Sequence, residues 1–289
     1  MEIHKNEEGM KQKICISKWL AKDYKEVYDQ FIGALASVGI APIVLNQTEE
    51  VWCRDFMPLY IGNGRYVGFN FRPDYLLSKP SYLKYITRQA LATEDLSIDY
   101  ADQVDLVLDG GNYVRCGDKV IITDKIFSEN PSYRPVNLLS RLEEALQAEV
   151  ILLPWDMEEP FGHADGMVSW LGDNQVLLNN YNQLEKGKEK PFLKRLISIL
   201  DYHFDVQELH YEDKISSDSW CYLNYLETED VIFLPALSLK HDCEADVAAM
   251  SAFEHIFQHK TIKQVFAQPL VKLGGALHCV TWEYYRQHR

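Results

Sequence analysis

Near its end the chain carries the segment Gly274-Gly275-Ala276-Leu277-His278-Cys279-Val280-Thr281-Trp282. Two glycines allow the backbone to bend and to be approached closely, and the apolar residues around the His-Cys pair are typical of a strand end. Such a segment can deliver the side chain of Cys279 into a confined site. The alternative is an inert core residue, because free cysteines are among the most buried residues. Under either interpretation His278 points away from Cys279 if the segment is extended.

Residues of the kind that carry chemistry recur at nearly equal distances before this segment. Asp55, Asp109, His163, Trp220 and Cys279 are separated by 54, 54, 57 and 59 residues, each close to one fifth of the chain. Equal spacing predicts a supersecondary unit repeated five times, with equivalent positions that point at one centre. Overt sequence similarity between the units is poor, so only the spacing carries this signal.

Strand-like and helix-like stretches alternate along the chain, which predicts an α/β fold. No Pro/Gly/Ser-rich linker divides the sequence, so we expect a single domain over residues 1–289. Apolar stripes at helical spacing predict helices at 24–35, 136–146, 192–200 and 244–258. Apolar or alternating runs predict strands at 13–16, 41–45, 104–108, 119–123, 150–153, 167–171, 175–178 and 231–234.

The composition is that of an ordinary globular protein with an acidic balance. The chain is 47% hydrophobic and 25% charged, with a net charge of −14 and a pI near 5.1. This charge argues against nucleic acid as a partner, since phosphate binding needs a surplus of Lys and Arg. It is compatible with attraction of a cationic ligand, or with nothing more than solubility.

The sequence also predicts where the protein works. No apolar run approaches the roughly 18 residues that a membrane span needs, and the polar start lacks the apolar core of a secretory signal. The six cysteines are scattered without a C-x-x-C pair, which favours free thiols in a reducing compartment. We therefore expect a cytoplasmic protein without a membrane partner, acting alone or as a homodimer.

Two aspartates upstream stand in unusual surroundings. In Trp52-Cys53-Arg54-Asp55-Phe56-Met57-Pro58 an arginine adjoins an aspartate among aromatic residues, as in a site or a buried ion pair. If this segment is extended, Asp55 can meet a ligand while Arg54 packs or pairs behind it. In Leu108-Asp109-Gly110-Gly111-Asn112 a carboxylate precedes two permissive glycines, which can hold a polar group close to the backbone or form a plain turn.

A histidine and an aspartate stand together in Pro160-Phe161-Gly162-His163-Ala164-Asp165-Gly166-Met167. On an extended segment His163 and Asp165 share a face, which would place a base that titrates near physiological pH beside a carboxylate. A satisfied polar turn is the alternative. The neighbouring Glu158 and Glu159 could attract a second cationic group, or form an exposed acidic turn.

Neither a metal nor an organic cofactor is expected. His163 and Asp165 could bind a metal, but no third and fourth ligand stands at a recognisable spacing. We interpret His255 and His259, four residues apart on a predicted helix, as solvated surface. The glycine signatures of nucleotide-binding folds, the serine-hydrolase elbow and the zincin H-E-x-x-H are absent from the sequence.

Taken in order, W-x-R-D, carboxylate-G-G, G-H-x-D and G-G-x-x-H-C resemble the agmatine deiminase and bacterial (Porphyromonas-type) peptidylarginine deiminase family. The resemblance covers nearly the whole chain and extends to segments 123–131 and 219–225. It implies the pentein fold of the guanidine-modifying superfamily, a five-bladed α/β propeller of ββαβ-like units with pseudo-fivefold symmetry. That fold would explain the near-equal spacing, because each blade sends residues to a central channel.

The resemblance also implies roles. Cys279 aligns with the nucleophile, His163 with the general acid/base, and Asp55 and Asp165 with the pair that binds the guanidinium. Asp109 takes the place of a family glutamate that orients the histidine and contacts a substrate nitrogen. We further expect the remaining candidates to contribute to substrate binding: Trp52, Arg54 and Trp220.

The implied activity is that of a cysteine hydrolase without cofactors. It would convert a guanidine, most simply agmatine, to a ureido product (N-carbamoylputrescine) and ammonia through a covalent thiouronium, a step toward putrescine and the polyamines. A planar, cationic guanidinium suits a pair of carboxylates. Alternative readings are a deiminase of free or peptidyl arginine, an amidinotransferase, a non-catalytic pentein scaffold that binds another protein, and a zinc hydrolase.

The sequence departs from the family pattern at three points. Asp109 is one methylene shorter than the usual glutamate, so its contact with the histidine could run through water or a shifted backbone. Leu273 replaces the third glycine of the last motif, which could narrow the approach to Cys279. The chain is also shorter than typical agmatine deiminases, so we expect trimmed rim loops.

Overall fold

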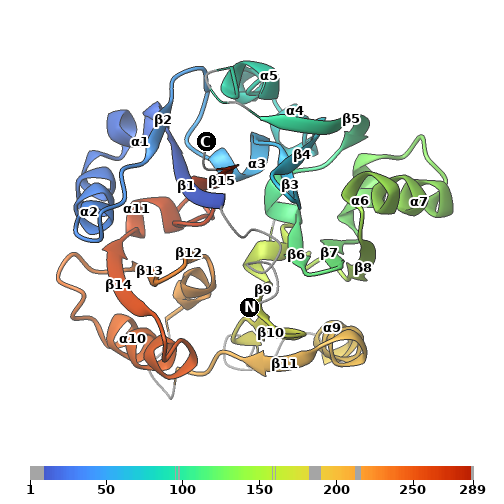
Figure 1. Ribbon diagram of the computed structural model, residues 1–289. Helices are drawn as coiled ribbons and strands as arrows, with labels where there is room; N and C mark the ends of the chain where they lie inside the picture. The colour runs from blue at the N-terminus through green and yellow to red at the C-terminus, as the bar shows by residue number, and fades with distance from the viewer. Residues whose placement is uncertain are drawn as a thin grey trace.

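The computed structural model describes residues 10–94, 96, 98–157, 159, 161–181, 190–211 and 216–287. Within them the strands form five three-stranded sheets, which stand as blades in a ring (Figure 1). The first blade has the order β15-β1-β2 and contains the two ends of the described chain. Its strands are β1 (Met10–Ser17), β2 (Ile43–Leu45) and β15 (Thr281–Gln287).

The other four blades follow one another along the chain. The second is built of β3 (Leu59–Gly62), β4 (Arg65–Asn70) and β5 (Asp99–Val107). The third is built of β6 (Val114–Cys116), β7 (Lys119–Thr123) and β8 (Glu149–Leu153). The fourth contains β9 (Val168–Gly172), β10 (Gln175–Leu178) and β11 (Asp205–Glu208). The fifth contains β12 (Leu226–Glu227), β13 (Val231–Ala236) and β14 (Thr261–Phe266).

Every blade has the same internal pattern. Its first two strands are antiparallel, and its third strand runs parallel to the second. A parallel pair needs a crossover connection, and helices supply it in each blade. The crossover helices are α1 (Lys18–Asp23), α2 (Lys25–Ala36), α4 (Asp74–Leu77), η2 (Pro80–Tyr85), α5 (Gln89–Ala92), α6 (Lys125–Glu129), α7 (Pro135–Leu146), α9 (Lys190–His203) and α10 (Glu244–Ile256).

This arrangement confirms the predicted α/β pentein fold with its repeated ββαβ unit. All predicted helices and strands are present, with ends that differ by a few residues. The prediction omitted β3, β4, β6, β11, β12, β14 and β15. Of these, β11 and β14 are edge strands of their sheets, and their sequences Asp-Val-Gln-Glu and Thr-Ile-Lys-Gln-Val-Phe carry too many polar residues to give an apolar run.

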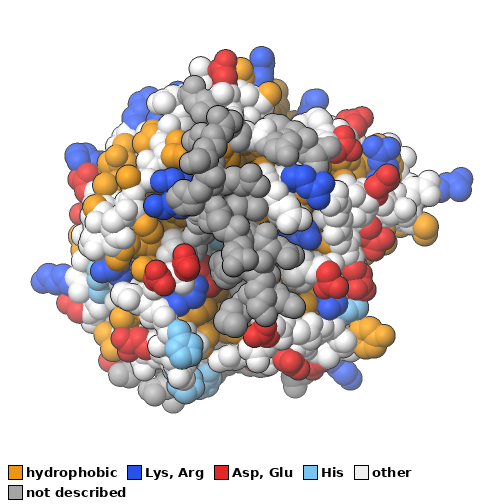
Figure 2. Space-filling view, viewed as in Figure 1, with side chains coloured by type: hydrophobic (Ala, Val, Ile, Leu, Met, Phe, Trp, Pro, Cys, Tyr) orange, Lys and Arg blue, Asp and Glu red, His pale blue; other side chains and the backbone are white. Residues whose placement is uncertain are grey.

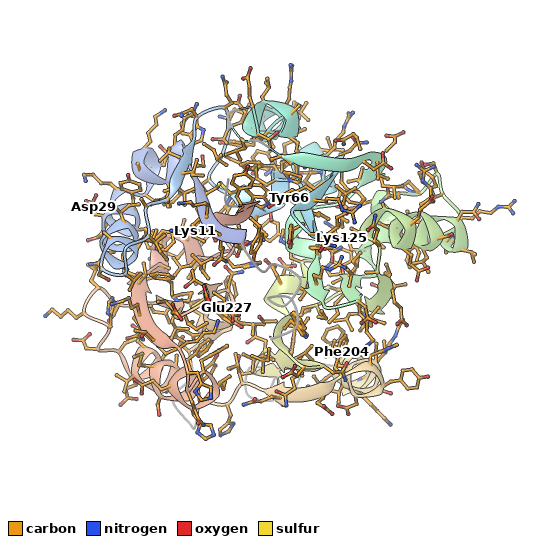
Figure 3. All side chains as sticks on the ribbon, viewed as in Figure 1. Lys11, Asp29, Tyr66, Lys125, Phe204 and Glu227 are labelled. Atoms are coloured by element: carbon orange, nitrogen blue, oxygen red, sulfur yellow. The ribbon has the colours of Figure 1, made fainter. Side chains whose placement is uncertain are left out.

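Pairing of the first and last described strands closes the ring. β1 and β15 pair antiparallel from Met10 opposite Gln287 to Ile16 opposite Thr281. Trp282 then joins this blade to the next, since its buried Nε1–H donates to the carbonyl oxygen of Pro58 at 2.9 Å. The ring of Trp282 also packs on Tyr66, which Figure 3 labels, with centroids 5.3 Å apart.

The structure also bears on the expectations about cysteines and about membrane-spanning helices. All six cysteines are free, as predicted. Among the described residues, the structure contains no helix with the length and apolar character to cross a membrane. Acidic and basic side chains are interspersed on the face that Figure 2 shows, so the charge is not gathered there into one patch.

The closure of the ring gives a testable prediction of stability. Trp282→Ala should lower the free energy of unfolding by about 3–5 kcal/mol, because it leaves a cavity between two blades and frees the Pro58 carbonyl. Urea denaturation followed by circular dichroism measures the change. Tyr202→Ala is the matched control: this side chain is 83% exposed, so we expect a change within about 0.5 kcal/mol. Equal effects of the two substitutions would contradict a role of Trp282 in closure.

Candidate active site

The segments that connect one blade to the next carry short helices toward the centre of the ring (Figure 1). Neighbouring short helices α3, η3, η4 and η5 contact one another around the ring, and α3 also contacts β15. The five residues whose spacing first indicated a repeat all lie in or directly beside such segments. The segments contain α3 (Cys53–Phe56), η3 (Gly110–Asn112), η4 (Ala164–Gly166), η5 (Ser219–Leu223) and α11 (Gln268–Val271).

A cavity of about 620 Å³, which we call the front cavity, opens at this centre. Cys279, His163 and Asp55 line it together with aromatic walls. The walls come from Trp52, Tyr75 and Phe161, and the mouth is formed by Trp19, Asp23, Tyr24, Glu49, Glu50, Tyr82, Lys84, Tyr85 and Leu273, among others. Leu273, which departs from the family pattern, is 50% exposed at this mouth.

His163 lies between two carboxylates. Its Nε2 is 3.2 Å from Asp109 Oδ2, and its Nδ1 is 3.9 Å from Asp55 Oδ1. Burial by itself would lower the pKa of His163, but Asp55 and the hydrogen bond to Asp109 outweigh it and raise the pKa to about 10. Burial raises the pKa of Asp55 to about 7, although His163 opposes that shift. The imidazolium form of His163 is therefore the form present at neutral pH.

Two carboxylate oxygens at this centre have no hydrogen-bond donor among the described residues. They are Asp55 Oδ1 and Asp109 Oδ1, both fully buried as atoms. A buried acceptor without a donor is costly, and native structures rarely leave one unexplained. A ligand that carries N–H donors would satisfy these two oxygens.

Cys279 is buried beside the same carboxylates, with 6% of its surface exposed. Burial, followed by the charges of Asp165 and Asp55, raises the pKa of its thiol well above the ordinary value. One donor opposes this, because Asn224 Nδ2 lies 3.1 Å from Cys279 Sγ. Asn224 Oδ1 in turn accepts from the backbone N–H groups of Ala276 and Cys279, at 2.9 and 3.2 Å. Asn224 therefore fixes both the loop and the sulfur.

The two glycines of the last motif are needed for close approach. Gly274 has φ +91°, and a Cβ there would lie 2.6 Å from the ring of Phe161. A Cβ at Gly275 would lie 2.4 Å from the ring of Trp52. Side chains at these positions would push the aromatic walls away from Cys279, so the glycines allow a narrow cavity next to the sulfur.

Buried charges also hold the loop that carries His163. Glu159 accepts hydrogen bonds from the backbone N–H groups of Phe161, Gly162 and His163. Its carboxylate is thus occupied by backbone N–H groups. Of the two alternatives left open for Glu159, the attraction of a second cationic group stays a prediction. Glu158 lies outside the described residues.

Two expectations of an extended backbone are wrong, although Asp55 lines the front cavity and Arg54 forms an ion pair, as expected. Residues 53–56 form a helix, because Met57 N–H bonds back to the carbonyl of Cys53 where the chain turns between blades, so this segment is not extended. His163 and Asp165 do not share a face, since the 3₁₀ turn Ala164–Gly166 rotates Asp165 away.

Asp165 lines a second cavity of about 840 Å³, which we call the back cavity and which His278, the neighbour of Cys279, also lines. There its Oδ2 is 2.7 Å from His278 Nδ1. Arg54 lines the same cavity, forms a short ion pair with Glu283, and donates its backbone N–H to the carbonyl of Cys279 at 3.0 Å. Both therefore lie behind the sulfur, and their expected contact with substrate stays a prediction.

The two remaining candidates, Trp52 and Trp220, also lie in different places. Trp52 lines the front cavity. Trp220 lies half-buried in η5, packs against the hydrophobic core, and accepts a bond from Asn179 at its backbone carbonyl. The residues that the sequence prediction missed are Asn224, Tyr75 and His278. Asn224 stands in a segment that already resembled the family, and its polar side chain in the run Tyr222-Leu223-Asn224-Tyr225-Leu226 was the available signal.

Metal binding is not supported by any grouping of side chains in the described part of the chain. No cluster of three or more His, Cys, Asp or Glu residues there has the geometry to hold an ion. His255 and His259 are exposed, as expected for solvated surface.

The closeness of Gly111 to His163 gives a testable prediction. A Cβ at position 111 would lie 2.4 Å from His163 Nδ1, so Gly111→Ala should displace the imidazole from Asp109. The pKa of His163 should then fall from about 10 toward its ordinary value near 6.5. Titration of the histidine by NMR measures it. Gly33→Ala, where a Cβ meets nothing within 4 Å, should leave the pKa unchanged; an unchanged pKa in both variants would refute the pairing.

Comparisons with known proteins agree with this geometry. Residues 10–284 match the model of the family described as Porphyromonas-type peptidyl-arginine deiminase. A Mycoplasma mycoides protein provisionally named an agmatine deiminase is 23% identical over 280 residues, which cover 83% of this chain and 76% of that protein.

Two solved structures share the fold. The agmatine deiminase of C. jejuni has a TM-score of 0.73 at 17% identity, covering 98% of this chain and 96% of that one. An amidinotransferase from Microseira wollei in the saxitoxin biosynthetic pathway has a TM-score of 0.62 at 14% identity, covering 93% and 81%. With the family match over nearly its whole length, the chain belongs to the Porphyromonas-type peptidyl-arginine deiminase family, whose hydrolases act on C–N bonds of amidines.

Proposed function

We propose that this protein is a cysteine-dependent deiminase that converts agmatine to N-carbamoylputrescine and ammonia. The observation that carries the proposal is the pair of donor-free oxygens, Asp55 Oδ1 and Asp109 Oδ1, buried in the site that holds Cys279. A guanidinium has five N–H donors in a rigid plane and a positive charge, so it satisfies such acceptors. Asp165 lines the back cavity, so it would act on the bound cation through its charge, which also acts on Cys279.

The same cation activates the nucleophile. In the free protein the Cys279 thiol is protonated at neutral pH, because burial and two carboxylates raise its pKa. A bound guanidinium offsets the charges of Asp165 and Asp55, so the thiol of Cys279 releases its proton to solvent and the thiolate forms. Protonated His163 and the amide of Asn224 stabilise the same anion. The thiolate then forms only when the substrate is present to react with it.

The reaction follows in two stages. The sulfur of Cys279 bonds to the central guanidinium carbon and gives a tetrahedral adduct. His163 gives its proton to the departing nitrogen, the C–N bond breaks, ammonia leaves, and a thiouronium remains on the sulfur. Neutral His163 then takes a proton from water, whose oxygen adds to the same carbon. Loss of the sulfur leaves the ureido product, and the overall reaction consumes one water and releases one ammonia.

The mouth of the front cavity supports a substrate with a cationic tail. Besides the central residues, the charged groups that line the cavity are the acidic Asp23, Glu49 and Glu50 and the basic Lys84. Burial and then the charges of Asp55 and Asp109 raise the pKa of Glu50 well above its ordinary value. A second positive charge at this place relieves the repulsion, whereas the α-carboxylate of free arginine adds to it. Agmatine, which ends in an amine, fits this balance better than arginine.

The first test is release of ammonia from four guanidines. We expect turnover of agmatine, with kcat/KM at least tenfold above free arginine, a C-terminal-arginine peptide and an internal-arginine peptide. Cys279→Ala should abolish it, while Cys243→Ala, at the N-cap of α10, should keep it. Preference for a peptide would make the protein a peptidylarginine deiminase. A new guanidine in place of ammonia would make it an amidinotransferase, and both results would contradict the proposal.

The second test asks whether the raised pKa of Cys279 slows the reaction of its thiol. Alkylation of Cys279 by iodoacetamide without substrate should be slow at pH 7 and accelerate through the alkaline range, because only the thiolate reacts. Asp165→Asn removes the neighbouring charge that raises this pKa most after burial. The rate at pH 8 should therefore rise on the order of tenfold, which one pKa unit corresponds to.

Peptide mapping by mass spectrometry follows the label on Cys279. The control is Asp29→Asn, on an exposed helix face where Asp29 pairs with Lys25, and it should leave the rate unchanged. A thiol that is already fully reactive at pH 7 in the free protein would contradict activation by the substrate.

A further inference from the structure

Tyr75 holds the most informative side chain that the reaction above does not use. It belongs to α4, in the crossover of the second blade, and its ring lines the front cavity. Its hydroxyl donates to Asp109 Oδ2 at 2.8 Å, and the same oxygen lies 3.2 Å from His163 Nε2. One carboxylate oxygen thus joins the tyrosine and the histidine, while the other oxygen of Asp109 has no donor among the residues that the structure describes.

Asp109 needs this support because its side chain is short. A single methylene connects its carboxylate to the backbone, and only Oδ2 reaches the imidazole. Rotation about that methylene would break the contact with His163, and the hydroxyl of Tyr75 opposes the rotation. It also leaves Oδ1 free to receive an N–H from substrate. Burial, followed by the charges of Asp109 and Asp55, raises the pKa of Tyr75 well above its ordinary value, so it remains a donor across the working range.

The position of Tyr75 is itself fixed by a buried cation. Lys125, labelled in Figure 3, lies over the ring of Tyr75 with its Nζ 5.1 Å from the centroid. The same Nζ pairs with Asp74 at 2.9 Å and donates to the carbonyl of Phe161 at 2.8 Å. Phe161 meets the Tyr75 ring edge-on at 5.1 Å. Lys125 therefore ties α4 to the loop that carries His163.

From this geometry we propose that Tyr75 is a positioning residue, which holds Asp109 in the rotamer that orients His163 for proton transfer. The proposal rests on the deiminase reaction above, and it goes beyond it by assigning work to a residue outside the four motifs. Tyr75 acts through Asp109 and His163 and does not bond to the reacting carbon. Its loss should consequently affect the chemical steps more than the binding of substrate.

The test is Tyr75→Phe, which keeps the ring against Lys125 and Phe161 and removes only the hydroxyl. We expect kcat for agmatine to fall about 10- to 100-fold, the loss that goes with a hydrogen bond to a charged group, while KM stays within about twofold. The pKa of His163 should fall below that of the wild type, because Asp109 can then rotate away from Nε2 and lose the contact that raises this pKa. The alkaline limb of the pH–rate profile should move downward with it.

Tyr133→Phe is the matched control. Its hydroxyl donates to the backbone carbonyl of Asp105 at 3.2 Å, on the exterior of the second and third blades, so its loss should change neither kcat nor the pKa of His163. If Tyr75 only formed part of the cavity wall, Tyr75→Phe would raise KM and leave the pH–rate profile unchanged. That result, or an unchanged pKa of His163 in Tyr75→Phe, would overturn the proposal.

A second pair of variants tests the link to the short carboxylate. Asp109→Glu adds a methylene and drives the carboxylate against the hydroxyl of Tyr75, so its activity should fall. The double variant Asp109→Glu/Tyr75→Phe should recover part of that loss, although Tyr75→Phe alone is harmful. Such non-additivity is expected of residues in contact. Strictly additive effects would overturn the coupling.

The NMR titration separates failure of this proposal from failure of the proposed function. The pKa of His163 in Tyr75→Phe is measurable without any substrate. If no guanidine is turned over by the wild type but the pKa falls as expected, the deiminase assignment fails and the positioning role stands. If turnover is found and the pKa does not move, the positioning role fails and the deiminase assignment stands.

Discussion

Closure of a ring of five sheets is the constraint on which everything else in this structure depends. The pairing of β1 with β15 brings the two ends of the described chain into one blade, and Trp282 bonds that blade to the next. A short segment at the centre then connects each blade to the next. All of these connecting segments pass close to the central axis of the ring, so residues more than 50 positions apart meet there. Cys279 meets His163 and Asp55 only once the ring is closed.

The centre so formed is electrostatically incomplete. Carboxylates of Asp55, Asp109 and Asp165 surround one imidazolium and one thiol, and burial strengthens each of their interactions. Within the described residues two carboxylate oxygens have no donor, and burial raises the pKa of the thiol. In the deiminase reaction that we propose, the arrival of a planar cation would satisfy the oxygens and favour the thiolate together. The reactive sulfur would then form only when that ligand is bound.

Glycines and buried charges set the dimensions of the site. Gly111, Gly274 and Gly275 lie where a Cβ would strike His163, Phe161 and Trp52, so the walls approach the centre as closely as backbone allows. Lys125 and Glu159 then fix the loop around His163, one from the side of α4 and the other by accepting three backbone N–H groups. The rigidity of the centre thus comes from residues that do not touch the substrate themselves.

The sequence by itself determined the repeat, the α/β class, the four longest helices and about half of the strands, because periodicity and spacing are local properties of a chain. It also supplied Cys279, His163 and the three aspartates as candidates. Tertiary structure alone decided which way they point: Asp165 turns to the back cavity, Arg54 pairs behind the sulfur, and Asn224 and Tyr75 join the site. Side-chain direction depends on the 3₁₀ and helical turns at the blade junctions, and those turns form because distant strands hold their ends. No local pattern encodes a contact of that kind.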